Sequence, residues 1–450
     1  MPHLPETSVT PEQEAAWAER FGRDRANLVA KNAVSSVGIR AAARVPEGVA
    51  ESALGFDVEV PQGDRTDQQR SGRCWMFASL NTLRQHVIAR LNLKTFELSQ
   101  AYPLFYDKLE KSNWFLLNVI DTVGEPLDGR LVQYLLQDPV GDGGQWDMFR
   151  SLIEKYGVVP KEAMPETACS RNTREMDKYL TRYLRGCACR LRGRAAEGAT
   201  REELLQIRTT MLADVRSLLA TCLGEPPRTF EVRLRDKDDN LVCHGSFTPH
   251  DFFADVVQVD VKRLISCVSA NTADKPFNRS LTVSRLGNVA EDGQVRYLNL
   301  PIERLKELAL AQLTDGRPVW FGCDVDQSYV RDEGLMATEC LAIDQLFGFA
   351  VEGCLDRAER LDYGESAMTH AMVLEGARLD EDGKPVLWKV ENSWGKDHGR
   401  DGFDTITDDW FDQYVYQVVV DEAYLTPEEL AAYRSDPIEL APWDPLGSLA

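Results

Sequence analysis

The hydrophobic pattern changes its period along the chain, and this change limits the folds that the sequence can adopt. Apolar residues recur at helical spacing over 74–91, 96–120 and 145–156. Later in the chain, 318–325 and 368–391 carry short apolar runs that are typical of buried strands. The sequence therefore predicts both helices and strands, and these helices come before these strands along the chain.

The net charge argues against several classes of partner. The 450 residues include 72 acidic and 51 basic side chains, which gives a formal charge of −21. Nucleic-acid binders and proteins that dock on anionic membranes need a basic surface, so neither class fits the whole chain. A basic island at 171–208 is the exception. It is either a solvated helix pair that meets acidic surface on a neighbouring subunit or a nucleic-acid-binding stripe, and the overall charge favours the first interpretation.

No segment of the sequence predicts secretion or membrane insertion. The first residues lack a basic region followed by an apolar run, and no apolar run reaches the length of about 18 residues that a membrane span requires. Ten cysteines in 450 residues are too few for a disulfide scaffold. We therefore expect a cytoplasmic protein whose cysteines stay reduced, which leaves one of them available for catalysis.

Cys74 is the candidate nucleophile because it stands where an apolar helix is expected to begin. Free N–H groups and the helix dipole at that position favour a thiolate, so we expect a lowered thiol pKa. Gln68 lies six residues upstream and can bring its amide N–H beside the backbone N–H of Cys74. Two such donors would form an oxyanion hole for acyl transfer. Most cysteines are buried packing residues, but this setting favours catalysis.

His370 is the candidate base, and hairpin geometry brings Asn392 close to it. Opposed residues in an antiparallel pair have numbers that sum to a constant, and a turn centred near 381 places residue 392 opposite residue 370, within a residue or two. An Asn beside a His fixes the imidazole tautomer and leaves the other ring nitrogen for a thiolate. His86 lies about 18 Å from Cys74 along the same helix and cannot reach it. Cys, His and Asn form a known variant of the catalytic triad.

Four segments resemble the papain-like cysteine peptidases: QQRSGRCWMFASLN, DGGQWD, MTHAMVLEG and VENSWG. The block PVWFGCDV and the ending APWDPLGSLA also resemble the bleomycin hydrolase and aminopeptidase C branch of that family. The resemblance covers nearly the whole chain. It implies an α+β fold of the papain-like type, with a helical half and an antiparallel β half. It also implies a large, mostly helical insertion and a C-terminal arm that reaches the active-site cleft.

The resemblance also implies roles for individual residues. Four positions are implied to be catalytic: the nucleophile Cys74, the base and acid His370, the imidazole-orienting Asn392 and the oxyanion donor Gln68. Five are implied to bind substrate: Asp142, Gly143, Gly144, Trp394 and Ala450. Trp394 would shield the His–Asn hydrogen bond from water. The glycines would allow close backbone approach of an extended peptide. The C-terminal carboxylate would meet the α-ammonium group of a substrate.

The spacing of Cys74 and His370 predicts a large insertion. They lie 296 residues apart (370 − 74), whereas papain-like enzymes typically show about 130–150. In the branch that the chain resembles, such added elements assemble six subunits into a ring, which implies a homohexamer. We expect five segments: an N-terminal helical segment (1–60), the helical half with the nucleophile (61–164), an inserted helical and hairpin domain for oligomerisation (165–300), the β half with His and Asn (301–420) and a C-terminal arm (421–450).

The leading hypothesis is an intracellular cysteine aminopeptidase that releases N-terminal residues from peptides, and that also hydrolyses the bleomycin amide. A chain terminus lying in the cleft would block subsites and confine cleavage to the first residues. The alternative is a catalytically silent peptide- or nucleic-acid-binding scaffold on the same fold. No metal or organic cofactor is implied, because Cys187-x-Cys189 with Cys243-His244 lacks the spacing of a zinc finger.

Overall fold

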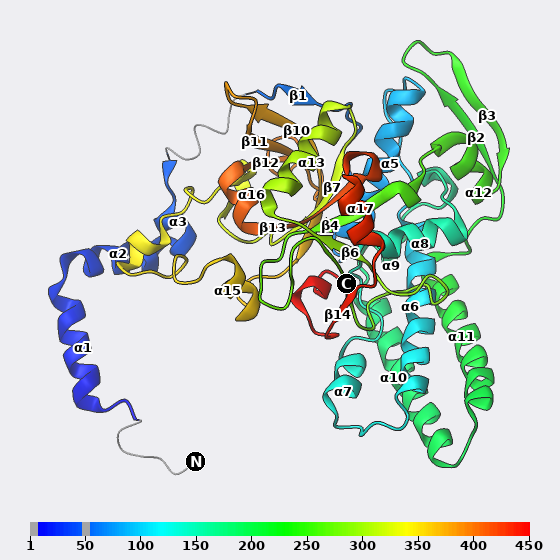
Figure 1. Cartoon of the computed structure of the whole chain (residues 1–450), viewed down its shortest axis with the longest axis horizontal. Coiled ribbons are helices and arrows are strands. Elements are labelled where there is room, and N and C mark those ends of the chain that lie inside the picture. The colour runs from blue at the N-terminus through cyan, green and yellow to red at the C-terminus, as the bar shows by residue number, and fades with distance from the viewer. Residues whose placement is uncertain (1–7, 47–54) are drawn as a thin grey trace.

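A mixed β-sheet packed against helices forms the centre of the computed structural model, which describes residues 8–46 and 55–450 (Figure 1). None of its described helices has the length and apolar character needed to cross a membrane. The helices are α1 (Pro11–Arg23), α2 (Arg25–Val37), α3 (Ile39–Ala43), α5 (Cys74–Arg90), α6 (Ala101–Asp121), α7 (Arg130–Gln137), α8 (Trp146–Tyr156), α9 (Ala168–Arg171), α10 (Arg174–Ala196), α11 (Arg201–Leu223), α12 (Pro249–Phe252), α13 (Ile302–Thr314), α14 (Ile343–Phe347), α15 (Arg357–Asp362), α16 (Asp408–Tyr414) and α17 (Pro427–Arg434).

The strands confirm the α+β class that the sequence predicts. In the main sheet they lie in the order β14-β5-β6-β4-β13-β7-β10-β11-β12-β9-β8, with β1 against β10, while β2 and β3 form a separate hairpin. The strands are β1 (Val58–Glu59), β2 (Phe230–Arg235), β3 (Leu241–Phe247), β4 (Leu264–Val268), β5 (Arg279–Val283), β6 (Tyr297–Asn299), β7 (Val319–Cys323), β8 (Tyr329–Val330), β9 (Leu335–Met336), β10 (His370–Leu379), β11 (Pro385–Glu391), β12 (Phe403–Thr407), β13 (Val415–Asp421) and β14 (Ile438–Leu440).

Strand β10 lies between two apolar cores, one packed on each of its faces. Ala371 and Val373 belong to the core shared with α5, whereas Met372 and Leu374 belong to the core on the other face. This division follows from the two-residue period of a strand, which sends successive side chains to opposite faces. The strand that begins with His370 is therefore fixed from both sides.

Helix α5 is buried on almost every side and begins at Cys74. Its N-cap is Arg73, and no side chain caps the first turn. Trp75, Leu80 and Val87 are fully buried along it, and each large apolar side chain so buried contributes about 1.5–3 kcal/mol. Burial rather than capping therefore determines where this helix lies.

The long helices α10 and α11 run antiparallel and pack against α6, away from the sheet (Figure 1). The side chain of Thr200 accepts the backbone N–H of Glu203, and the side chain of Glu203 returns to the Thr200 backbone, which caps α11. The β2–β3 hairpin also lies outside the main sheet. Strands β4, β5 and β6 belong to the main sheet, although they lie within residues 165–300, the range expected to form an inserted domain.

Arginines of the basic island at 171–208 make contacts within their own chain. Arg185 and Arg192 donate to backbone carbonyls at the ends of α7 and α6, respectively, and Arg201 pairs with Asp121 at 2.6 Å. The sequence suggested acidic surface on a neighbouring subunit as their partner, whereas these three arginines use acceptors of the same subunit. Guanidinium groups engaged in this way are less free to contact phosphates, which favours the solvated helix pair over the nucleic-acid stripe.

Candidate active site

The Cys74 thiol lies at the start of α5, against the strand that begins with His370. The side chain is buried, and the backbone amide of Ala371 lies within hydrogen-bonding reach of the sulfur. Burial raises the pKa of the Cys74 thiol to about 11, against the smaller opposite effect of the backbone amides of Ala371, Trp75 and Cys74. The lowered pKa expected from the helix N-terminus is therefore not observed for the isolated thiol, because desolvation outweighs the helix end.

His370 and Asn392 form a side-chain hydrogen bond under an aromatic ring. The imidazole Nε2 lies 3.0 Å from the amide Oδ1 of Asn392, and the ring of Trp394 lies 4.9 Å from the imidazole, centroid to centroid. Nε2 is thereby occupied, which leaves Nδ1 for the thiol. Burial lowers the pKa of His370 to about 4, while the Asn392 hydrogen bond acts in the opposite direction.

The register of the β10–β11 hairpin differs by two residues from the predicted one. Val373 lies opposite Glu391, so the paired numbers sum to 764 rather than 762, and a bulge follows Leu374. Asn392 is therefore the diagonal rather than the direct neighbour of His370. Diagonal positions on one face of a sheet stay within reach of long side chains, which explains why the hydrogen bond forms all the same.

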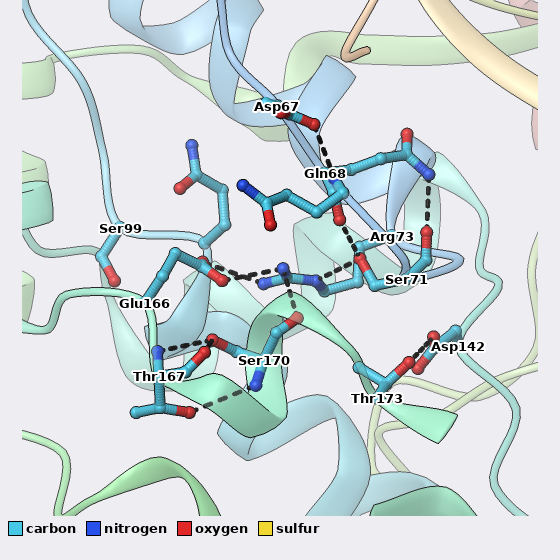
Figure 2. A network of polar contacts seen from close by, with 12 residues as sticks. Asp67, Gln68, Ser71, Arg73, Ser99, Asp142, Glu166, Thr167, Ser170 and Thr173 are labelled. Atoms are coloured by element: carbon cyan, nitrogen blue, oxygen red, sulfur yellow. Dashed lines mark hydrogen bonds and ion pairs between the residues drawn. The ribbon is translucent and has the colours of Figure 1, made fainter. Parts of the chain in front are cut away.

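Gln68 is held in the loop that precedes α5. Its Nε2 donates to the carbonyl of Ser71 at 2.7 Å (Figure 2), and its Oε1 accepts the hydroxyl of Ser393 at 2.6 Å. The backbone N–H of Gln68 donates to the carbonyl of Ser393 at 2.8 Å. An amide nitrogen carries two N–H groups, so one stays available for an oxyanion next to Cys74.

Arg73, the residue before Cys74, holds the loop that precedes α5 through its buried guanidinium group. Its Nη1 and Nη2 donate to the two carboxylate oxygens of Glu166 at 3.0 and 2.8 Å, and Nη2 also donates to the carbonyl of Ser170 at 2.7 Å (Figure 2). Paired contacts of this kind are the strongest that an arginine makes with a carboxylate. The residue directly before the nucleophile is thus anchored to the segment around α9.

The carboxylate of Asp142 contacts the loop of Cys74. It accepts the backbone N–H of Gly72 at 2.8 Å, the hydroxyl of Thr173 at 2.5 Å and the ammonium of Lys108 at 2.7 Å. Burial alone would raise the pKa of this carboxyl, but Lys108 and these hydrogen bonds hold the pKa well below its usual value. The backbone carbonyl of Asp142 accepts the indole N–H of Trp75 at 2.7 Å, so the loop is fastened at both ends.

The two glycines after Asp142 lie against the C-terminal residues. The N–H of Gly144 donates to the carbonyl of Leu449 at 2.8 Å. A Cβ on Gly143 would overlap that carbonyl, and a Cβ on Gly144 would lie 2.5 Å from the ring of Trp75. Both positions therefore need glycine, because the C-terminal segment approaches the backbone of Gly143 and the Trp75 ring approaches that of Gly144.

The C-terminal segment is packed rather than loose. Leu449 is 4% exposed, and the hydroxyl of Ser448 donates to the carbonyl of Met368 at 2.9 Å, two residues before His370. Ala450 and Ser448 line a cavity of about 380 Å³ with Lys111. The last residues of the chain thus lie between the glycine loop and the strand of His370.

Two close neighbours of the His370–Asn392 pair were missed by sequence reasoning, namely Asp404 and His398. Asn392 Nδ2 donates to Asp404 at 2.8 Å, and His398 Nε2 lies 3.1 Å from the same carboxylate. The sequence offered one signal for Asp404: in β12 it alternates with Ile406, so an acidic side chain is expected on the same buried face as an apolar one. Among residues 8–46 and 55–450, no group of three or more His, Cys, Asp or Glu side chains is arranged to hold a metal ion.

Comparisons with known protein families, sequences and structures all point to one family of peptidases. Residues 8–447 match the model of the peptidase C1-like family. The chain is 47% identical over 420 residues to aminopeptidase C of Streptococcus thermophilus, covering 93% of this chain and 94% of the relative. It is 39% identical over 451 residues to bleomycin hydrolase of Gallus gallus, covering 98% and 99%. The crystal structure of PepW from Lactobacillus rhamnosis HN001 superposes with a TM-score of 0.96 at 43% identity, covering 99% of this chain and all of PepW.

Proposed function

The chain belongs to the peptidase C1-like family and is a cysteine-type aminopeptidase with a papain-like fold, and from this premise we propose the roles of its residues. Cys74 is the nucleophile, His370 the general base and acid, Asn392 the residue that orients the imidazole and Gln68 the oxyanion donor. The observation that carries this assignment is the 3.0 Å hydrogen bond from His370 to Asn392 under Trp394, beside the buried start of α5.

In the proposed reaction, Cys74 transfers its proton to His370 and attacks the carbonyl carbon of the first peptide bond. The carbonyl oxygen becomes an oxyanion that accepts from the Gln68 amide and the backbone N–H of Cys74. His370 gives the proton to the leaving amine as the C–N bond breaks, which leaves an acyl-enzyme. The imidazole then takes a proton from water, whose oxygen displaces the thiolate and releases the N-terminal residue.

The buried setting favours this proton transfer over the charging of either group alone. Desolvation disfavours an isolated thiolate at Cys74 and an isolated imidazolium at His370. A proton that passes between them creates two opposite charges in contact, and their attraction is strong where water is excluded. All four catalytic positions carry functional side chains, so we do not propose the catalytically silent scaffold.

The C-terminal segment supports aminopeptidase action on peptides. We propose the cytoplasm as the place of this activity. Gly144 donates to Leu449 through the N–H that an extended substrate would otherwise use. The Ala450 carboxylate then offers an anion to the α-ammonium group of a peptide. A substrate would therefore bind with its first residue next to Cys74, with Asp142 fixing the loop and Trp394 covering the imidazole. The amide of bleomycin falls within the same chemistry, by analogy with the relative of that name.

Replacing Gln68 with alanine is expected to lower kcat by about 10²–10³-fold with little change in KM, because an oxyanion donor acts mainly in the transition state. Steady-state rates on aminoacyl fluorogenic amides measure both constants. Gln69→Asn is the matched control, since Gln69 is exposed on the same loop with a φ of 53° that Asn tolerates. An unchanged kcat in the Gln68 variant would remove this residue from the oxyanion hole.

We also propose that the protein is a homohexamer, with the part of residues 165–300 that lies outside the main sheet serving assembly. Helices α1 and α2 extend away from the main sheet (Figure 1). They support subunit contact, because they contain no buried residue in the single chain and expose Trp17, Phe21 and Leu28. Light scattering should give a mass near six times the 50.6 kDa of one chain. A particle of a single chain's mass would contradict the hexamer.

A further inference from the structure

Asp404 is a buried carboxylate on β12, next to the catalytic hydrogen bonds. One oxygen accepts Nδ2 of Asn392 at 2.8 Å, and the other accepts the hydroxyl of Tyr329 at 2.9 Å. The imidazole Nε2 of His398 lies 3.1 Å from the second oxygen. The β11–β12 pairing places Asp404 opposite Val390, so that its side chain reaches the residue that follows β11. The carboxylate is thus held from three separate segments.

These contacts fix the orientation of the Asn392 amide. A carboxylate can only accept, so the NH₂ end of the amide must face Asp404 and the carbonyl end must face His370. The backbone N–H of Ser393 reinforces this choice by donating to the same Oδ1 at 2.8 Å. A flipped amide would bring two acceptors together at Asp404 and two donors together at Ser393. The imidazole therefore meets an acceptor rather than a donor at Nε2.

We propose that Asp404 is a positioning residue for the thiol–imidazole pair, and that it acts through the amide of Asn392. The hydrogen-bonded row runs from His370 through Asn392 to Asp404, and the Cys74 sulfur lies within reach of the backbone amide of Ala371, the residue after His370. A fixed negative charge at the end of the row favours the imidazolium that forms when Cys74 gives up its proton. This inference rests on the proposed function, and it adds a residue that neither the motifs nor the family resemblance assigned.

Charged groups other than Asp404 also act on His370, so the test must separate their effects on the pKa of the imidazole. The negative charges of Asp404 and Asp326 both raise the pKa of His370, whereas His398 lowers it. Arg331 lies over the Trp394 ring at 5.1 Å and pairs with Asp326. Asp404 differs from Asp326 in that only Asp404 is joined to the imidazole through hydrogen bonds.

The test is the rate at which iodoacetate alkylates Cys74 as a function of pH, with the modified peptide identified by mass spectrometry. This anionic reagent reacts best with a thiolate beside an imidazolium, so the rate falls at high pH when His370 loses its proton. In Asp404→Asn, an isosteric change that removes the charge, we expect this alkaline limb to shift to lower pH by about one unit. Asp404→Ser carries the same expectation if the first variant does not fold, as judged by its melting curve.

Asp326→Asn is the matched control, because its side chain is 63% exposed and its charge is screened by solvent. It should leave the alkaline limb in place. A lower rate in Asp404→Asn with both limbs unchanged would overturn the proposal, since a merely structural role predicts that result, and so would equal shifts in the two variants. If the wild-type Cys74 shows no such pH dependence, the thiolate–imidazolium assignment fails first and this inference fails with it.

Discussion

Replacing Cys74 with alanine is expected to lower kcat/KM for aminoacyl fluorogenic amides by about four to six orders of magnitude. Removing a nucleophile leaves only the contribution of the oxyanion hole and of substrate binding, which is small by comparison. The thiol is buried at the start of α5 beside the strand of His370, so alanine removes one sulfur without disturbing the loop that Arg73 and Gln68 hold. Steady-state assays on the purified variant measure the loss.

The matched control for this prediction is Cys354→Ala. Cys354 is exposed and free, so its replacement removes a reactive thiol that lies elsewhere in the chain. Its activity should equal that of the wild type, and both variants should melt at nearly the same temperature as the wild type. Turnover by Cys74→Ala at the wild-type rate would refute the assignment of the nucleophile.

Removing Leu449 and Ala450 is expected to convert the exopeptidase into an enzyme that also cuts N-acetylated peptides internally. The truncation frees the N–H of Gly144 for a substrate backbone and withdraws the carboxylate that selects an α-ammonium group. It also exposes surface that the Leu449 side chain covers, at a cost of about 1.5–3 kcal/mol in stability. The measurement is cleavage of one peptide with a free and with an acetylated N-terminus, analysed by mass spectrometry.

Ala450→Ser provides the comparison for the truncation, because it keeps the chain length and the terminal carboxylate. This variant should leave the acetylated peptide intact and trim the free peptide from its N-terminus. Should the truncated enzyme also leave the acetylated peptide uncut, the C-terminal segment would not be the element that restricts cleavage.

Local patterns were sufficient to predict the elements that carry the site, but not all of the sheet. The apolar run at the start of β10 and the periodicity of α5 are local signals, and the structure has both elements where they were expected. The register of the hairpin differed by two residues because its turn is centred near residue 382 rather than 381, with Leu379 paired to Pro385. Strands β4 and β6 are buried throughout and pair in parallel, so neither alternation nor adjacency in sequence reveals them.

In the candidate site, too, residues within local sequence motifs could be predicted, whereas residues brought in by strand pairing could not. Cys74, His370 and Gln68 stand in recognisable sequence patterns, whereas Asp404 gains its role only because β12 pairs with β11. The expected lowering of the Cys74 pKa did not appear for the isolated thiol. A helix start can be inferred from sequence, but the loss of water around it depends on the packing of distant segments.

The bidentate contact of Arg73 with Glu166 joins the loop of Cys74 to the sequence that follows the expected helical half. The Glu166 carboxylate neutralises a guanidinium that is 1% exposed directly beside Cys74, and the Ser170 carbonyl accepts a hydrogen bond from the same group. Excising that stretch would strand a buried cation without its acceptors, which is far more costly than losing an exposed ion pair. The loop of Cys74 and the segment around α9 therefore depend on each other, and any design that shortens the chain there would need to replace this arginine first.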